Sequence, residues 1–231
     1  MLFSAIRTMF SGGHVDLTSI IAQILSVVFV VMCILPFHEF AHGWLAVKLG
    51  DDTPKYDRRL TLNPLASLDP MGALWLLLFG IGWAKPVQVN PRNFRNPKRD
   101  MAFVALAGPV ANLIAAFLGA LVYYAFILFA PANTFTMFIY YFLNSYIVIN
   151  VTLAVFNLIP IPPLDGSRIV SAFLSNEAMF MYYRYQNYIV MIFFFVMLSG
   201  MLSKPLNIAE NFFLDIILWI ARKPYELFGL I

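Results

Sequence analysis

Long apolar runs separated by short polar stretches dominate this chain. Residues 17–37 contain no charged side chain, and the apolar pattern continues through the polar sequence HEFAH to Val47. A helix that ended near Leu49 would be about 50 Å long at 1.5 Å per residue, whereas the hydrocarbon core of a bilayer is about 30 Å thick. We therefore predict a long, tilted or protruding helix, bent where Pro36 removes a backbone hydrogen bond, with HEFAH towards its C-terminal end.

Three further segments, 101–130, 136–159 and 186–202, have the length and composition of membrane helices. In the first of these, small residues recur every three or four positions, which would let another helix approach closely. Residues 68–83 are apolar but short and broken by glycine, which predicts a re-entrant hairpin or a short tilted helix. The C-terminal segment 203–231 is amphipathic and would lie on the membrane or line the bundle.

The polar segment 84–100 carries five basic residues and several proline turns, with a brief alternation from Val87 through Gln88 to Val89. This pattern predicts a small β-hairpin at the membrane interface. The predicted fold is an all-α polytopic membrane protein with five or six membrane segments and this hairpin. We expect residues 1–231 to form one domain, with a core over about 19–202.

Composition and charge support a membrane protein. Hydrophobic residues make up 61% of the chain and charged residues 12%, against about 25% charged in soluble domains. The single cysteine, Cys33, excludes an intramolecular disulfide and a cysteine-based zinc site. The net charge of +3 resides in loops, which suits membrane orientation and not nucleic-acid binding. The first 16 residues lack the features of a cleaved signal, so we expect them to belong to the mature protein.

Basic residues also predict the orientation. Lys and Arg gather in loops 48–59 and 84–100 and recur at Arg168 and Arg184, whereas loop 131–135 carries no charge. By the positive-inside rule the basic loops face the cytoplasm. HEFAH and Asp165 then lie at similar depth near the cytoplasmic side of an integral membrane protein, which we expect in a prokaryotic cell membrane.

HEFAH carries the candidate chemistry. His38 and His42 are four residues apart, so on a helix they share one face and can bind the same zinc ion. Zinc activates a water molecule, and Glu39 is placed to take its proton as general base. The alternative is a pair of ordinary core histidines. Three polar groups inside an apolar helix need a compensating partner, however, and a metal supplies one.

A catalytic zinc site needs a third protein ligand. The acidic candidates outside the basic loops are Asp69, Asp165, Glu177, Glu210 and Asp215. Asp165 follows a proline-stiffened turn after a predicted span, which could present its carboxylate inwards. The other interpretation of Asp165 is an Asx-turn or a cap for the next helix, and the residue pattern leaves both open.

Three motifs in the same order resemble the site-2 protease family of intramembrane zinc metalloproteases. They are HEFAH at 38–42, GPVAN at 108–112 and NLIPIPPLDG at 157–166, and the resemblance covers roughly residues 19–202. GWAKPVQVNPRNF is similar to the membrane-associated hairpin of short members, which lack PDZ and CBS domains. One departure is Ser67 in NPLAS, where short members often have histidine; that histidine is not a zinc ligand in the family.

The resemblance implies one zinc ion per chain with Asp165 as third ligand. It also implies that Asn157 lines the site, and we take Asn157 and Asn112 as candidate donors to substrate or to the developing oxyanion. The alternative for Asn157 is an interhelical hydrogen bond. The implied function is hydrolysis of peptide bonds in or beside the transmembrane segments of single-pass membrane proteins.

Two other functions compete with proteolysis. A catalytically silent helix-binding membrane chaperone of the same fold would be expected to lack Glu39 or a metal ligand, and this chain has them all. A membrane metal transporter would spread polar residues across the whole bilayer depth, whereas here they cluster near one face.

The segment around Gln88 suggests how a substrate could dock. A transmembrane helix must unwind before cleavage, and its freed backbone then needs new hydrogen-bond partners. An unwound substrate could add as a strand to Val87, Gln88 and Val89. The alternative is a basic cytoplasmic loop that only fixes the topology.

Overall fold

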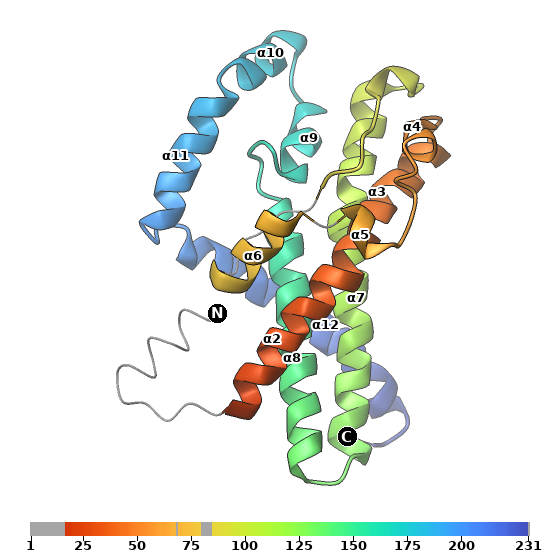
Figure 1. The fold of residues 1–231 in the computed structure, drawn as a ribbon, viewed down its shortest axis with the longest axis vertical. Helices are drawn as coiled ribbons and strands as arrows, with labels where there is room; N and C mark the ends of the chain where they lie inside the picture. The colour runs from red at the N-terminus through yellow and green to blue at the C-terminus, as the bar shows by residue number, and fades with distance from the viewer. Residues whose placement is uncertain (1–16, 68, 80–84, 231) are drawn as a thin grey trace.

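The computed structural model describes residues 17–67, 69–79 and 85–230, which form helices joined by loops, with no strand among them (Figure 1). In chain order the elements are α2 (Leu17–Phe29), the π-helical turn η1 (Val30–Ile34), α3 (Leu35–Lys48), α4 (Thr53–Tyr56), α5 (Pro64–Ser67), α6 (Pro70–Phe79), the 3₁₀ turn η2 (Pro91–Asn93), α7 (Pro97–Phe129), α8 (Thr134–Asn157), α9 (Asp165–Ser171), α10 (Asn176–Arg184), α11 (Gln186–Leu198) and α12 (Ser203–Leu227). The all-α class is confirmed for the described residues. The N-terminal 16 residues lie outside them.

The predicted long first helix is a single helical run from Leu17 to Lys48. Its regular winding is interrupted at η1, directly before the turn that contains Pro36. In a regular helix the proline ring would clash with the carbonyl four residues earlier, at Met32, and a wider turn relieves that clash. The disruption predicted at Pro36 therefore takes the form of a π-helical turn within the membrane segment.

Three helical runs among the described residues are long and apolar enough to cross a membrane: Leu17–Lys48, Pro97–Phe129 and Thr134–Asn157. The number rises to four if α11 and α12, which meet at an 86° bend, count as one broken span. Helix α6 has 10 residues, about 15 Å, and is too short to span; its neighbours 68 and 80–84 lie outside the described residues. The five or six membrane segments expected from the sequence therefore remain a prediction.

The core forms where the first helical run, α7, α8 and α12 pack together. Small residues on α7 make the closest approach: Ala116 and Ala120 are fully buried, and Gly119 faces Tyr146 of α8. Helix α12 joins this core through Ile217 and Ala221. Of the two positions considered for the C-terminal amphipathic segment, the structure shows it lining the bundle.

The predicted β-hairpin at 84–100 is wrong for its described part, 85–100. Residues 85–90 are extended but pair with no strand, η2 follows, and α7 begins at Pro97. Two of the backbone N–H groups that a ladder would use donate instead to carboxylates: Val87 N–H to Glu39 and Asn90 N–H to Asp51. Pro86 and Pro91 have no N–H to donate. The alternation of apolar and polar residues around Gln88 could not reveal that carboxylates distant in the sequence accept these hydrogen bonds.

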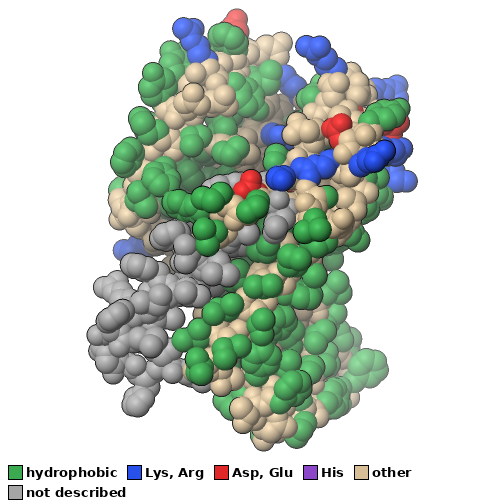
Figure 2. Space-filling model, in the orientation of Figure 1, with side chains coloured by type: hydrophobic (Ala, Val, Ile, Leu, Met, Phe, Trp, Pro, Cys, Tyr) green, Lys and Arg blue, Asp and Glu red, His purple; other side chains and the backbone are tan. Residues whose placement is uncertain are grey.

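Charge is distributed unevenly over the face of the molecule drawn in Figure 2. In the view of Figure 2 the Lys and Arg side chains gather at one end, and the surface of the opposite half is almost entirely hydrophobic or neutral. The basic end holds α4, the start of α7, α9 and α10 (Figure 1). We refer to it below as the basic end of the bundle.

The close packing of α7 on α8 gives a stability test. A Cβ at Gly119 would lie 2.6 Å from Cε1 of Tyr146, whose ring also packs against Phe29 at 5.8 Å between centroids. We expect Gly119→Ala to destabilise the protein by about 1–3 kcal/mol, because the ring has little room to move. Thermal unfolding in detergent measures the change. Leu118→Ala, at a neighbouring side chain that is 55% exposed, should leave the midpoint nearly unchanged; equal midpoints for all three proteins would contradict this packing.

Candidate metal centre

Two histidines of α3 form one side of a buried polar cluster. His38 and His42 are each 5% exposed, and their rings meet edge to face, with the Nε2 atoms 3.1 Å apart. The four-residue spacing puts them one turn apart on the same helix face, as predicted. Their Nε2 atoms therefore converge on the same point.

Asp165 completes the cluster from a distant part of the chain. Its Oδ2 lies 3.3 Å from Nε2 of His38 and 3.2 Å from Nε2 of His42. Asp165 is the first residue of α9, and no side chain accepts a capping hydrogen bond at the start of that helix. The carboxylate of Asp165 therefore does not cap α9. Within the described residues this trio is the group of His, Cys, Asp and Glu side chains that could hold a metal ion.

The three ligand atoms have the spacing that a tetrahedral metal requires. Ligands at 2.0–2.1 Å around a tetrahedral centre lie about 3.3 Å from one another, and the three distances here are 3.1, 3.2 and 3.3 Å. Oδ2 of Asp165 is buried and makes no hydrogen bond to a described residue. A buried carboxylate oxygen without a donor is costly, and a cation at the centre of the triangle would remove that cost.

The outer nitrogens of both imidazoles show which atoms carry protons. His42 Nδ1 lies 2.7 Å from the carbonyl oxygen of Val104, which can only accept, so Nδ1 is the donor. His38 Nδ1 lies 3.1 Å from Oδ1 of Asn112, an amide oxygen that also can only accept, so this Nδ1 is the donor as well. In the neutral form both Nε2 atoms then point a lone pair into the triangle. Two lone pairs and a carboxylate facing one another repel unless a cation lies between them.

Helix α7 supplies both of these outer partners and comes unusually close at Gly108. A Cβ at this position would lie 2.3 Å from Nε2 of His42 and 2.5 Å from Cε1 of His38. The absence of a side chain at Gly108 therefore leaves space directly at the ligand atoms. The sequence identified Gly108 as a small residue suited to helix packing but did not reveal that it faces the histidines.

Glu39 is held by a hydrogen bond from the extended segment. Its Oε2 accepts a hydrogen bond of 2.8 Å from the backbone N–H of Val87. Its Oε1 has no hydrogen-bond partner among the described residues. One oxygen is thus held in place and the other is available to accept a proton.

Asp51, just past the end of α3, fixes the same segment at a second point. Its buried carboxylate accepts hydrogen bonds from the side chain and backbone of Thr53, the backbone N–H of Asn90 and the side chain of Asn93. Burial raises the pKa of Asp51, but these donors outweigh it and hold the pKa below its ordinary value. The contribution of this anchor to stability is therefore present at neutral pH and is lost as the pH falls through the lowered pKa.

The charge of Asp165 depends on the histidines. Burial raises the pKa of its carboxyl, and the two imidazoles, when protonated, lower it more strongly, so the pKa lies well below the ordinary value. With protonated imidazoles Asp165 is therefore a carboxylate; when the imidazoles are neutral, a bound cation would replace them in stabilising that charge.

The other residues singled out from the sequence lie as follows. Asn112 is fully buried and holds His38, with its Nδ2 unpaired among the described residues. Asn157 donates to the carbonyl of Leu153 within its own helix. Gln88 is exposed and Val89 half-buried. The roles in oxyanion binding and substrate docking remain predictions.

Comparisons with known proteins agree with a metallopeptidase. Residues 125–200, which include Asp165, match the family profile described as "Peptidase family M50". A protein of Bacillus subtilis named "Putative zinc metalloprotease YwhC" is 44% identical over 138 residues, covering 58% of this chain and 62% of the relative. A protein of Mycolicibacterium smegmatis named "Putative zinc metalloprotease Rip2" is 35% identical over 148 residues, covering 62% of this chain and 55% of the relative. The match thus spans less than two thirds of either relative's length, and no solved structure matches the chain.

Gly108 provides a test of the metal centre. We expect Gly108→Ala to bind little or no metal, because its methyl group would occupy space at the ligand nitrogens. Gly43→Ala is the matched control: it lies next to His42, and its Cβ would meet its nearest atoms at an ordinary 3.4 Å. Elemental analysis of the purified proteins gives the metal content per chain. Gly119→Ala, which crowds the core and not the ligand atoms, shows how much metal is lost through reduced stability alone. Full metal content in Gly108→Ala would show that the ligand triangle is not the binding site.

Proposed function

We propose that this chain is a zinc metalloprotease in which His38, His42 and Asp165 hold the metal and Glu39 is the general base. The match of residues 125–200 to the profile of peptidase family M50 supports the proposal. The observation that carries the proposal is the triangle of two Nε2 atoms and one carboxylate oxygen, all within 4.8 Å of one another. Three protein ligands leave a fourth position open, as in catalytic zinc sites.

Zinc is the metal in the names of both relatives, and its donor preference fits two imidazoles and a carboxylate. When bound, zinc lowers the pKa of a coordinated water to about 7 and polarises a substrate carbonyl. The residues of this chain supply the remaining steps. Oε1 of Glu39 takes the proton, while the hydrogen bond from Val87 keeps the carboxylate in position.

We further propose that cleavage occurs in or beside transmembrane segments. HEFAH lies within the apolar helical run Leu17–Lys48, towards its C-terminal end. A site at that depth is reached most directly by chains that are themselves in the bilayer, so single-pass membrane proteins are the proposed substrates. The basic end of the bundle, by the positive-inside rule, is proposed to face the cytoplasm.

Docking of an unwound substrate is proposed at the extended segment 85–90. The N–H groups of Gln88 and Val89 have no hydrogen-bond partner among the described residues, and Gln88 is exposed. On an extended segment the N–H of Gln88 points to the side opposite that of Val87, so a substrate strand could pair with it without displacing the hydrogen bond from Val87 to Glu39. We propose Asn157, the last residue of α8, as a donor to the oxyanion.

Exchange of Glu39 for Gln should separate metal binding from catalysis. The amide cannot take a proton but can still accept the hydrogen bond from Val87, so zinc content should remain near one per chain. Hydrolysis of a transmembrane peptide should fall by at least about 100-fold, the usual contribution of a general base. Cleavage at the wild-type rate would remove Glu39 as the base. A non-catalytic chaperone would bind the peptide equally well in both proteins and cleave it in neither.

A proline at Gln88 tests the docking of substrate. Gln88→Pro deletes one unpaired backbone N–H and leaves the metal ligands untouched. We expect cleavage of a membrane-inserted substrate to fall strongly while zinc content persists. Gln88→Ala, which keeps the backbone N–H, is the control and should cleave at nearly the wild-type rate. If the proline variant matched the control, strand addition at this segment would have to be abandoned.

A further inference from the structure

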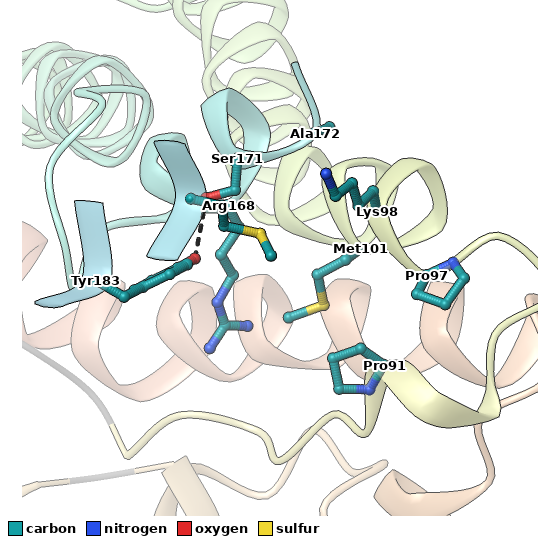
Figure 3. Close-up of a pocket in the computed structure, with 9 residues that line it drawn as sticks. Pro91, Pro97, Lys98, Met101, Arg168, Ser171, Ala172 and Tyr183 are labelled. Carbon is teal, nitrogen blue, oxygen red and sulfur yellow. Dashed lines mark hydrogen bonds between the residues drawn. The ribbon is translucent and has the colours of Figure 1, made fainter. Parts of the chain in front are cut away.

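A cavity of about 350 Å³ lies beside the metal centre, at the basic end of the bundle. It is half-open and is bordered by the start of α7, by α9 and α10, and by Pro91 at the start of η2 (Figure 3). Its walls are mostly apolar, with Pro91, Pro97, Met101, Ala172 and Met179 among them. The cavity is large enough for a side chain of several atoms, and its polar groups decide which kind.

The central polar group is the guanidinium of Arg168. Figure 3 shows it between Tyr183 on one side and Met101 and Pro91 on the other. No described carboxylate or carbonyl pairs with Arg168. By contrast, Lys55 pairs with Asp52, and Arg99 with Asp100.

The remaining polar groups of the cavity add donors, not negative charge. The hydroxyl of Ser171 donates to the carbonyl of Ser167, so the hydroxyl of Tyr183 must donate to Ser171. The ammonium of Lys98 donates to the carbonyl of Leu174 and keeps two further hydrogens. A half-buried guanidinium with a second cation nearby and no acid among the lining residues is suited to bind an anion.

Three chain segments place this cavity close to the metal centre. Arg168 is one helical turn after Asp165 on α9. Met101 is one turn before Val104, whose carbonyl holds His42. Along the extended segment, Pro91 follows Val87 by four residues, which corresponds to about 13 Å. A substrate strand running beside that segment from the metal centre would reach the cavity after three or four residues.

We propose that this cavity is a specificity subsite that binds an acidic side chain of the substrate, three or four residues from the cleaved bond towards the basic end of the bundle. Arg168 is the specificity-determining residue, with Lys98 as second donor and the apolar walls holding the methylene groups of Asp or Glu. This inference rests on the proposed proteolytic function, because it needs a peptide aligned at the metal centre.

Binding without turnover tests the subsite. The probe is a fluorescent transmembrane peptide with Glu at the third or fourth position from its centre, compared with the same peptide carrying Gln. Binding to zinc-loaded Glu39→Gln protein in phosphatidylcholine nanodiscs should favour the Glu peptide by about tenfold, the effect of one charge-assisted hydrogen bond. Adding Arg168→Gln should reduce this ratio to about one, and Arg168→Glu should reverse it in favour of a Lys peptide.

Arg184→Gln is the matched control, since it removes one positive charge from the same connection but lies outside this cavity. It should keep the tenfold ratio. Equal binding of the Glu and Gln peptides, or equal loss of the preference in the Arg168 and Arg184 variants, would overturn the subsite. Repeating the measurement with anionic phosphatidylglycerol identifies a competing occupant: loss of the preference there would assign the cavity to a lipid phosphate and overturn the proposal.

The same peptides distinguish this inference from the proposed function. Wild-type protein that binds the Glu peptide selectively but cleaves neither peptide would contradict proteolysis and leave the subsite standing. Wild-type protein that cleaves both peptides at equal rates would support proteolysis and overturn the subsite.

Discussion

The mutual repulsion of three electron-rich atoms is the constraint on which the rest of this structure depends. Two imidazole nitrogens and a carboxylate oxygen lie 3.1–3.3 Å apart in a buried setting, an arrangement that a protein interior does not adopt without compensation. Each neighbouring element helps to maintain it. Helix α7 approaches without a side chain at Gly108 and fixes both outer imidazole nitrogens, and α9 starts with the carboxylate.

The sequence predicted the parts of this arrangement that depend on short-range spacing. The positions of His38, Glu39 and His42 follow from the helical repeat, and the long first helix follows from its uninterrupted apolar run. Asp165 was one of five acidic candidates on the residue pattern, and the family resemblance selected it. The structure brings it to the histidines from more than 120 residues away in the chain.

Features that depend on contacts between distant segments could not be predicted in this way. Alternation around Gln88 suggested a hairpin, but the N–H groups of Val87 and Asn90 bind carboxylates at 39 and 51 instead of a second strand. The importance of Gly108 depends on which side of α7 faces the histidines, which small-residue spacing alone does not determine. From the sequence Arg168 is only a charge that orients the chain, because its lack of an acidic partner among the described residues is a property of the folded protein.

The two outer hydrogen bonds of the histidines have a consequence for membrane assembly. They join successive turns of α3 to Val104 and Asn112, two turns apart on α7. A displacement of α7 by one residue would move its groups by about 1.5 Å along and 100° around the helix axis, and would break both bonds together. The two bonds thus couple the geometry of the metal centre to helix register: a chain inserted or assembled out of register would not present both Nε2 atoms to the carboxylate of Asp165.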